Sequence, residues 1–370
     1  MRIHHFYPRT SNLGDRFVAL GIERLFRSLV PEAVSVSFDV NDRGSDPEAY
    51  GITLRTVERA NREADLVVVG GSNLYEAVPG RNRWGVHLDP SALPRLRVPM
   101  LLVGIGTGSD PGARRPTPPT PQVAEEIRLL NRYAVFSGVR DVVTLEWLQA
   151  LGVSTAQLLG DPATFLFCLP VREPRQVRRV ALVPPPRRPY WERWRRIRFW
   201  DMRGPNLWRA MADLVRELVA SGLEVWVMCN DPRDVSLVRD LFAYGRLAIE
   251  LASSAESYLA LLQEMDAVVT ARLHTAVVAL SLGIPFVLVD LDQRTHGFVR
   301  TFGLGEWTVP YAWAGMTSHL RRRVLHLVSG KTDWRPFVAK RDEMRDRALA
   351  MLRGAIAVGP AAEPPAVRIR

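Results

Sequence analysis

The chain has 370 residues, of which 47% are hydrophobic and 24% charged, and its net charge is +10. This composition excludes a wholly disordered protein, and the length favours two domains that each bury a core. The positive charge predicts attraction to anions, whether phosphorylated small molecules, nucleic acid or an anionic membrane, without choosing among them.

The two cysteines and the amino-terminal segment bear on which cellular compartment we expect for the protein. Cys168 and Cys229 lie far apart in apolar surroundings, which excludes a disulfide framework and a zinc cluster of the CxxC kind. The first ten residues, MRIHHFYPRT, lack the apolar core of a signal peptide. We therefore expect a cytoplasmic protein with no metal site.

Short apolar runs alternate with longer amphipathic ones, a pattern that predicts βαβ units and largely parallel sheets. In the first half we expect helices at 15–29, 121–132 and 141–151, and strands at 2–7, 34–40, 64–71, 99–106, 134–138 and 156–160. His4 and His5 alternate on the first strand and are interpreted as packing residues. The Pro/Arg-rich stretch 170–179 then interrupts the pattern and is a candidate linker.

The series of strands resumes after this stretch, at 179–185, 224–229, 247–251, 266–271 and 285–290. Asp231 before Pro232 predicts one helix start, and Ser253 with Glu256 fits a capping box at another. The fold class we predict is α/β, with two Rossmann-like parallel-sheet domains facing a cleft. Its parts are a first domain at 1–170, a linker at 171–179, a second domain at 180–335, a C-terminal helix at 336–358 and a disordered tail at 359–370.

The segment VVTARLHTAVVALSLGIPFV, residues 268–287, places Arg272 and His274 in a strand-to-helix turn. Ligands of open α/β sheets lie beyond the carboxyl ends of strands, where helix amino termini attract anions. Arg272 adds a planar set of donors for carboxylate or phosphate, and His274 adds a group that exchanges protons near neutral pH. The alternative is structural, with Arg272 paired to an acid such as Asp266 and His274 capping the helix.

The segment 266–304, with Arg-Leu-His after a strand and Gly-Ile-Pro after the helix, resembles the polysaccharide pyruvyl transferase family. Five further segments agree in order with that family: NLGD at 12–15, VVVGGSNLYE at 67–76, VGIGTG at 103–108, SGVRDVVTLEWLQALGV at 137–153 and GDPA at 160–163. The resemblance covers roughly residues 10–305. It implies a two-domain GT-B-like fold.

The resemblance also implies the reaction, in which the pyruvyl group of phosphoenolpyruvate moves onto two hydroxyls of a sugar to form a ketal. No cofactor is implied, because phosphoenolpyruvate is a co-substrate. His274 is then the general acid or base, and Arg272 assists it. The implied donor-binding residues are Arg140, from the Ser-x-Arg-Asp station, with Arg272, Leu273, His274 and Arg294. Arg294 stands where the family usually has lysine.

Two glycine-containing motifs are candidates for contact with the acceptor or with phosphate. NLGD, with Asn12, Gly14 and Asp15, lies between the first strand and the first helix, where Gly14 permits a tight turn and Asp15 can cap the helix. Gly70, Gly71 and Ser72 end a buried strand, where a ligand could approach the backbone or a plain turn could explain them. Asp161-Pro162 is interpreted as structural.

The stretch 187–203, RRPYWERWRRIRFWDMR, holds seven arginines against two acids, with aromatic residues between them. Three interpretations stay open: tryptophans packed on the domain, peripheral contact with an anionic membrane face, or contact with the acceptor or with nucleic acid. A lipid-linked saccharide acceptor would suit membrane contact. Nothing else in the sequence supports a nucleic-acid partner. Two alternatives to pyruvyl transfer also stay open: a nucleotide-sugar glycosyltransferase, and a catalytically silent sugar- or membrane-binding protein.

Overall fold

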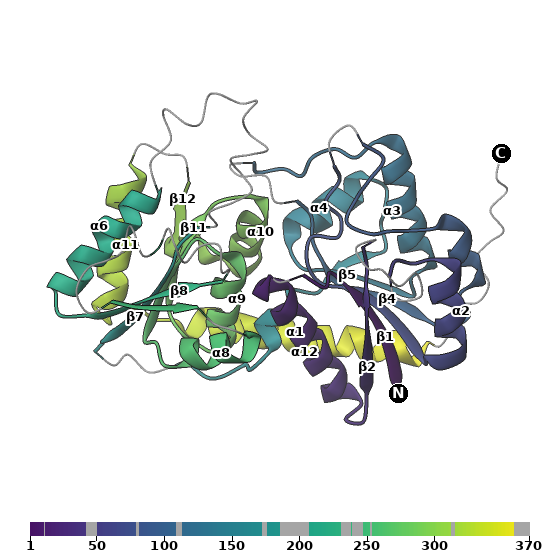
Figure 1. Cartoon of the computed structure of the whole chain (residues 1–370), viewed down its shortest axis with the longest axis horizontal. Coiled ribbons are helices and arrows are strands. Elements are labelled where there is room, and N and C mark those ends of the chain that lie inside the picture. The colour runs from purple at the N-terminus through teal and green to yellow at the C-terminus, as the bar shows by residue number, and fades with distance from the viewer. Residues whose placement is uncertain are drawn as a thin grey trace.

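The computed structural model describes residues 1–10, 12–41, 50–78, 81–108, 113–171, 176–185, 207–230, 238, 247–251, 254–311 and 315–358. Two six-stranded sheets, in which the neighbouring strands pair in parallel, lie side by side along the long axis of the molecule (Figure 1). The predicted α/β class with two Rossmann-like sheets is confirmed.

The first sheet has the strand order β2-β1-β3-β4-β5-β6. Strands β3 and β4 are buried along their whole length, because helices cover both faces of a parallel sheet. The elements of this half are β1 (Arg2–Tyr7), α1 (Leu13–Leu29), β2 (Val34–Asp39), α2 (Leu54–Glu63), β3 (Leu66–Gly70), η1 (Pro90–Arg95), β4 (Met100–Ile105), α3 (Pro121–Tyr133), β5 (Phe136–Val139), α4 (Val142–Ala150), β6 (Ala156–Leu158) and η2 (Pro162–Phe165).

The second sheet has the order β12-β11-β10-β7-β8-β9. Its central strands β10 and β11 are also buried throughout, and so is the helix α9 between them. The elements are β7 (Arg179–Val183), α6 (Leu207–Ala220), β8 (Glu224–Cys229), β9 (Leu247–Leu251), α8 (Ala255–Gln263), β10 (Ala267–Thr270), α9 (Leu273–Ser281), β11 (Phe286–Asp290), α10 (Gln293–Phe302), η4 (Leu304–Trp307), β12 (Thr308–Pro310), α11 (Met316–Val328) and α12 (Arg335–Ala357).

Helix α1 joins the two halves. The ring of Phe17 in α1 lies 5.5 Å from the ring of Tyr258 in α8, and the backbone of Pro162 packs directly on Gly21. The buried side chains of α1 therefore form one continuous hydrophobic cluster with those around the second sheet. Because the burial of this apolar surface stabilises both halves together, it fixes how the two sheets lie relative to each other.

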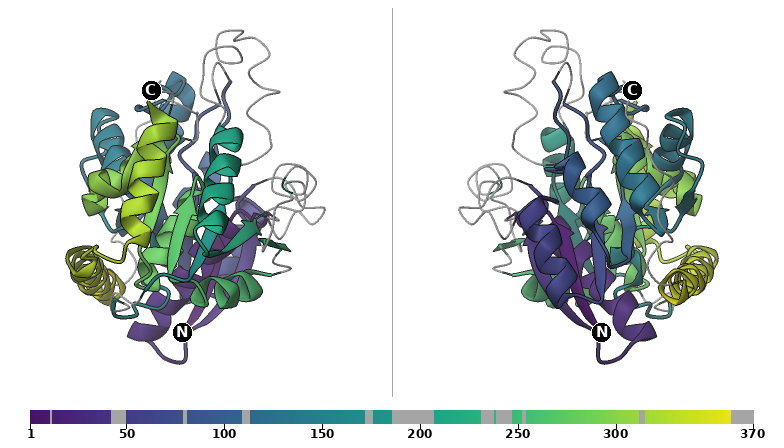
Figure 2. Two further views of the ribbon diagram at one scale, coloured as in Figure 1. Left: turned by 90° about the vertical axis from the view of Figure 1, so that its left-hand side faces the viewer. Right: turned by 90° about the vertical axis from the view of Figure 1, so that its right-hand side faces the viewer.

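Helix α12 runs beneath both halves in Figure 1 and is seen end-on in Figure 2. Its Arg341 is fully buried, and Nη1 donates to the carbonyl oxygens of Leu169 (2.8 Å), Leu280 (2.9 Å) and Ser281 (3.0 Å). The last two carbonyls end α9, where backbone acceptors lack partners within the helix and a cation complements the helix dipole. The last helix thus holds α9 at its carboxyl end.

Several predicted boundaries differ from the structure by one or two residues. Helix α1 begins at Leu13, two residues early, because Asn12 rather than Asp15 is its cap. The capping box of α8 joins Ser254 to Ser257, not Ser253 to Glu256: Ser254 Oγ accepts from the Ser257 N–H at 3.1 Å, and Ser257 Oγ accepts from the Ser254 N–H at 3.0 Å. Strand β7 begins at Arg179, as predicted, although the predicted linker had also included that residue.

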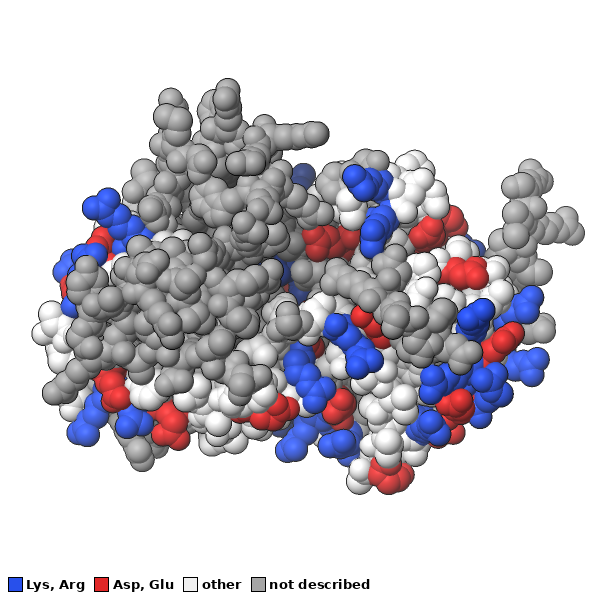
Figure 3. All heavy atoms as spheres, viewed as in Figure 1, with Lys and Arg blue, Asp and Glu red and all other residues white. Residues whose placement is uncertain are grey.

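Several sequence predictions fall outside the described residues. They are the helix start at Asp231-Pro232, residue Ser253 itself, the basic and aromatic stretch 187–203 and the tail 359–370. On the face in Figure 3, the lysines and arginines of the described surface are interspersed with aspartates and glutamates. No helix in the described ranges is long and apolar enough to cross a bilayer.

Candidate active site

Residues that follow the carboxyl ends of strands in both sheets meet at one place. β10 ends at Thr270 and α9 begins at Leu273, which puts His274 in the first turn of α9. Gly14 lies in the first turn of α1, which follows β1, and Asp161 follows β6. Helices α1 and η2 both contact α9. This edge is where open α/β sheets bind ligands.

His274 is enclosed between the two halves of the molecule and only 9% exposed. A Cβ on Gly14 would overlap the imidazole at Nδ1, so only glycine lets α1 approach so closely. On the other side, Nε2 lies 3.7 Å from Oδ2 of Asp161. Neither atom has a hydrogen-bond partner among the described residues. Buried polar atoms of this kind are uncommon in proteins and need an explanation.

Burial shifts the protonation of both groups toward their neutral forms. Burial, and then the charges of Arg140 and Arg294, lowers the pKa of His274 to about 3. Burial raises the pKa of Asp161 to about 6, against the opposing effects of Arg140 and of the Ala163 amide. At neutral pH His274 is therefore uncharged, and the Asp161 carboxyl titrates near pH 6.

Arg140 follows β5 and is fixed in the interior with 2% exposure. Its Nε donates to Oδ2 of Asp141 at 3.0 Å, and its Nη2 donates to the carbonyl of Thr107 at 3.2 Å. A Cβ on Gly106 would overlap the guanidinium, so this glycine leaves the space that Arg140 fills. Within the described chain Nη1 has no hydrogen-bond partner. The structure thus presents a rigidly held cation with one uncommitted nitrogen near His274.

The start of α10 brings two more polar side chains to the site. Asp292 caps this helix by accepting from the backbone N–H groups of Arg294 and Thr295, and its carboxylate also pairs with the Arg294 guanidinium. Gln293 is 1% exposed and packs against Gly108 of the first half. Neither polar atom of the Gln293 amide has a hydrogen-bond partner in the described ranges.

Arg272 lies at the same edge, but its side chain turns toward the next strand. Nε donates to the carbonyl oxygen of Pro184, just beyond β7, at 3.1 Å. Asp266, the acid considered as its partner, instead accepts from the backbone N–H groups of Arg178 and Arg179. No described side chain caps α9, so His274 is not a helix cap. Arg272 therefore makes a structural contact in this turn, but not the ion pair with Asp266 that the sequence suggested.

The NLGD motif is held by bonds within the protein. Asn12 caps α1 by accepting from the Gly14 N–H at 3.1 Å. The Asp15 carboxylate, predicted as a possible cap, instead accepts from Ser72 Oγ at 2.6 Å and from Thr10 Oγ1. Asp15 thus ties the β1–α1 loop to the end of β3, and Gly14 serves close packing against His274 rather than a tight turn.

Close packing also accounts for the glycines at the end of β3. A Cβ on Gly70 would overlap the carbonyl of Val103, and one on Gly71 would come within 2.7 Å of Val18. Gly71 also has φ of +82°, which L side chains rarely adopt. Leu273, implied as a donor-site residue, is buried in the hydrophobic cluster. Gly70, Gly71 and Leu273 therefore pack against the interior of the protein.

Sequence reasoning missed Asp161 and Gln293. The Asp-Pro pair was interpreted as structural, and one oxygen of Asp161 does cap a helix: Oδ1 accepts from the Ala163 N–H at 3.0 Å. Its second oxygen faces His274, which no local pattern reveals. Gln293 had no signal beyond its place beside Arg294 at a helix start. His4 and His5, predicted as packing residues, are buried in β1.

Two parallel sheets whose carboxyl edges meet define a GT-B-like protein. Similar solved structures include a putative UDP-N-acetylglucosamine 2-epimerase from Listeria monocytogenes, at 14% identity and TM-score 0.58, covering 100% of this chain and 99% of that one. The UDP-GlcNAc 2-epimerase from Neisseria meningitidis bound to UDP-GlcNAc aligns at 9% identity and TM-score 0.56, covering 96% of this chain and 100% of the other. At these identities the likeness shows the fold alone.

The family follows from the sequence. The family model described as polysaccharide pyruvyl transferase matches residues 12–293, so the chain belongs to this family. The match runs from Asn12 through Gln293 and includes Arg140, Asp161 and His274. The predicted family resemblance is thereby confirmed. A search of curated protein sequences found no match.

Proposed function

We propose that this protein transfers the pyruvyl group of phosphoenolpyruvate onto two hydroxyls of a sugar, which forms a cyclic ketal. Membership of the polysaccharide pyruvyl transferase family supports a transferase. The observation that carries the finer proposal is the buried pair of His274 and Asp161, 3.7 Å apart, with Arg140 and Arg294 close enough to lower the pKa of His274. The reaction needs this combination of cations and proton carriers.

Phosphoenolpyruvate presents a phosphate and a carboxylate, and each anionic group needs donors. Arg140 offers Nη1 from a fixed guanidinium, and Arg294 offers a second guanidinium at the start of α10. The first turn of α9, which has no side-chain cap, offers backbone N–H groups and the positive end of the helix dipole. Arg272 adds charge at the N-cap position of the same helix. Charge-assisted contacts of this kind are the strong ones in anion recognition.

The proton transfers balance as follows. Asp161, in its protonated form, gives a proton to the methylene carbon of phosphoenolpyruvate, and the central carbon becomes electrophilic. The oxygen of the first sugar hydroxyl bonds to that carbon, and His274 Nε2 accepts the proton of the same hydroxyl. The carbon–oxygen bond to phosphate breaks, and the second hydroxyl closes the ketal ring. Of the two hydroxyl protons, one ends in the new methyl group, through re-protonation of Asp161, and the other leaves with phosphate.

Calorimetric titration with phosphoenolpyruvate tests the donor without an acceptor in hand. We expect saturable binding by the unmodified protein and binding at least tenfold weaker for Arg294→Ala, because a hydrogen bond to a charged group contributes about 1.5–3 kcal/mol. Arg335→Ala is the matched control, since Arg335 is exposed on α12 and pairs with Asp333 away from the site. UDP-GlcNAc, which the Neisseria epimerase binds, is titrated in parallel.

The two titrations separate the alternatives. Equal affinity for phosphoenolpyruvate in Arg294→Ala and Arg335→Ala would remove Arg294 from the donor site. Binding of UDP-GlcNAc with no response to phosphoenolpyruvate would replace pyruvyl transfer by glycosyl transfer on the same scaffold. Binding of neither would favour a sugar-binding protein without catalytic activity.

The cellular setting is a separate part of the proposal. It rests on the sequence, in which residues 187–203 combine arginines with tryptophans as membrane-surface segments do. A cytoplasmic enzyme with peripheral contact at the inner membrane face would meet a lipid-linked acceptor. Failure of the protein to sediment with anionic vesicles at low salt would contradict this part alone.

A further inference from the structure

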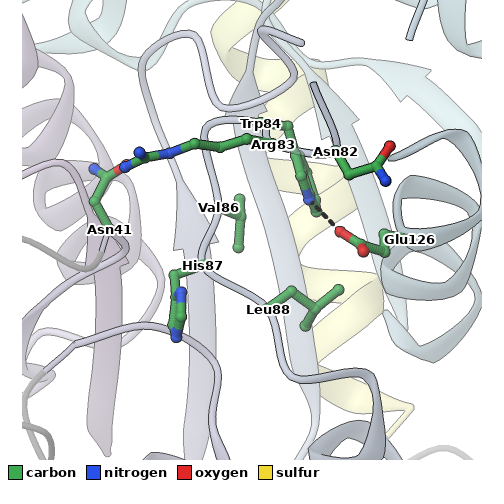
Figure 4. A pocket seen from close by; sticks show the side chains of 8 residues that line it. All are labelled: Asn41, Asn82, Arg83, Trp84, Val86, His87, Leu88 and Glu126. Atoms are coloured by element: carbon green, nitrogen blue, oxygen red, sulfur yellow. Dashed lines mark hydrogen bonds between the residues drawn. The ribbon is translucent and has the colours of Figure 1, made fainter. Parts of the chain in front are cut away.

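A pocket of about 270 Å³ opens in the first half of the molecule (Figure 4), lined by residues other than those around His274. Arg83 reaches across it toward Asn41, above the side chains of Val86 and His87. The indole of Trp84 forms one wall, where Nε1 donates to Oε2 of Glu126 at 2.8 Å. The lining residues are Asn41, Asn82, Arg83, Trp84, Val86, His87, Leu88 and Glu126.

Neighbouring contacts make this wall rigid. The rings of Trp84 and Tyr75 are parallel to within 2°, with centroids 6.3 Å apart. Glu126 also accepts from Gln122 Nε2 at 3.1 Å. A carboxylate has about four lone-pair positions, so Glu126 can still accept from a ligand. The polar wall is therefore held in place before any ligand arrives.

The chemistry of the lining selects one class of ligand. Arg83 and Glu126 carry opposite charges, so the pocket lacks the surplus of cations that a phosphate or nucleotide needs. Its polar side chains also argue against an apolar ligand, which prefers a mostly hydrophobic lining. Amide, carboxylate and guanidinium groups around a small apolar floor suit an uncharged molecule rich in hydroxyl groups, such as a pyranose.

The position of the pocket relates it to the candidate active site. Asn41 follows β2, and the His87 N–H donates to the carbonyl oxygen of Val40, so the pocket lies at the carboxyl edge of the first sheet, beside its edge strand β2. Asp161 follows β6, the strand at the other edge of the same sheet. None of the residues that line the pocket is among those described around His274. A sugar in the pocket and a sugar beside His274 would be different units of one chain.

We propose that this pocket binds a neutral sugar unit of an oligosaccharide acceptor, distant from the unit that receives pyruvate. The proposal rests on pyruvyl transfer for its biological meaning but not for its test. It predicts that the protein prefers an oligosaccharide to a monosaccharide, because only the longer chain reaches both the pocket and the site at His274.

Saturation-transfer NMR with neutral sugars tests the pocket directly. The probes are cellotriose, maltotriose and N,N′,N″-triacetylchitotriose, each beside the methyl glycoside of its own monosaccharide. We expect at least one trisaccharide to bind more tightly than its methyl glycoside. The double variant Arg83→Ala/His87→Ala should weaken that binding at least fivefold. Both side chains are exposed, so the fold should tolerate their removal. Arg81→Ala is the matched control, because Arg81 is exposed nearby but does not line the pocket.

The outcomes also separate this proposal from the donor assignment. Trisaccharide binding that is lost in the double variant, with phosphoenolpyruvate binding unchanged, supports the pocket. The proposal is overturned if no trisaccharide binds, if the double variant binds like Arg81→Ala, or if it loses phosphoenolpyruvate binding as well, which would indicate a general disturbance of the domain. Sugar binding without phosphoenolpyruvate binding would sink pyruvyl transfer and leave the pocket standing.

Discussion

The two sheet edges that meet at His274 hold their charged groups in different ways. On the first edge, Arg140 is 2% exposed and fixed by Asp141 and Thr107. On the second edge, the Arg294 side chain is 19% exposed and extends from the first turn of a helix. The first edge thus holds its arginine rigidly in the core, with only Nη1 left without a partner among the described residues, whereas the arginine of the second edge is partly open to solvent.

This difference suggests a division of labour between the halves. A buried cation costs desolvation energy and tolerates little change, so it can supply a fixed field around Asp161 and His274. A partly exposed arginine loses less free energy when it exchanges a protein partner for a ligand, so it suits the binding and release of a substrate. Substitutions at the two edges should therefore differ in effect as much as the burial of the two arginines implies.

The largest expected effect is on turnover. His274→Gln should lower the rate of phosphate release from phosphoenolpyruvate, measured in the presence of a saccharide acceptor, by 100-fold or more, since a positioned acid or base contributes about 10²–10⁴-fold. The glutamine amide keeps a polar group beside Gly14, so the thermal midpoint should change little. A variant with more than a tenth of the original rate would exclude His274 as the base.

Arg140→Ala is expected to have the largest effect on stability. It leaves Asp141 buried beside an empty volume, and breaking a buried ion pair costs about 3–5 kcal/mol. Arg300→Ala is the control, because Arg300 also pairs with a carboxylate, that of Glu146, but this pair is exposed, and such pairs contribute about 1 kcal/mol or less. Chemical denaturation of both variants measures the contrast. Equal losses would mean that burial does not distinguish the two.

Gly14→Ala tests the contact between the edges. The added methyl group would overlap the His274 ring, and overpacking of this kind costs about 1–3 kcal/mol. Gly354→Ala in α12 is the matched control, since no atom lies within 4 Å of its Cβ position, and alanine should stabilise that helix by about 0.5–1 kcal/mol. In urea unfolding, we expect Gly14→Ala to lower the free energy of unfolding and Gly354→Ala to raise it. A neutral Gly14→Ala would show that α1 is free to shift.

The smallest expected effect is a gain in the free energy of unfolding on removal of a buried acid. The pKa of Asp161 is raised to about 6 from an ordinary 3.8, so the folded state binds this proton more tightly and loses stability as pH rises through about 6. Asp161→Asn removes that loss and keeps the cap on Ala163. It should be more stable than the unmodified protein by about 1–3 kcal/mol at pH 8, and the gain should shrink below pH 6. A destabilised variant at pH 8 would contradict the buried-acid interpretation.

Much of the fold was predictable because its signals are local. Short apolar runs located every described strand except β12 to within a few residues, since a strand buried on both faces needs continuous apolar side chains. The three-residue strand β12 was not predicted. One error at a helix start was the capping box at Ser254. There, two adjacent serines in the sequence offered equivalent caps, and the local pattern did not distinguish them.

The candidate site was only half predictable, for the same physical reason. A turn between strand and helix indicated Arg272 and His274, because the chemistry and the local structure lie in one short segment. No short segment around Asp161 or Gln293 indicates a site, because the place of each in the site depends on a residue of the other half. Asp161 faces His274, and Gln293 packs against Gly108.

The sequence by itself determined the class of fold, the family and the residues at the strand-to-helix turn, because periodicity and short motifs are properties of neighbouring residues. Only the tertiary structure decided which side chains face one another. It brought a carboxyl from the first sheet within 3.7 Å of an imidazole from the second and removed both from water, which shifted their pKa values. Burial depends on every element packed around a group, and no short stretch of sequence contains that information.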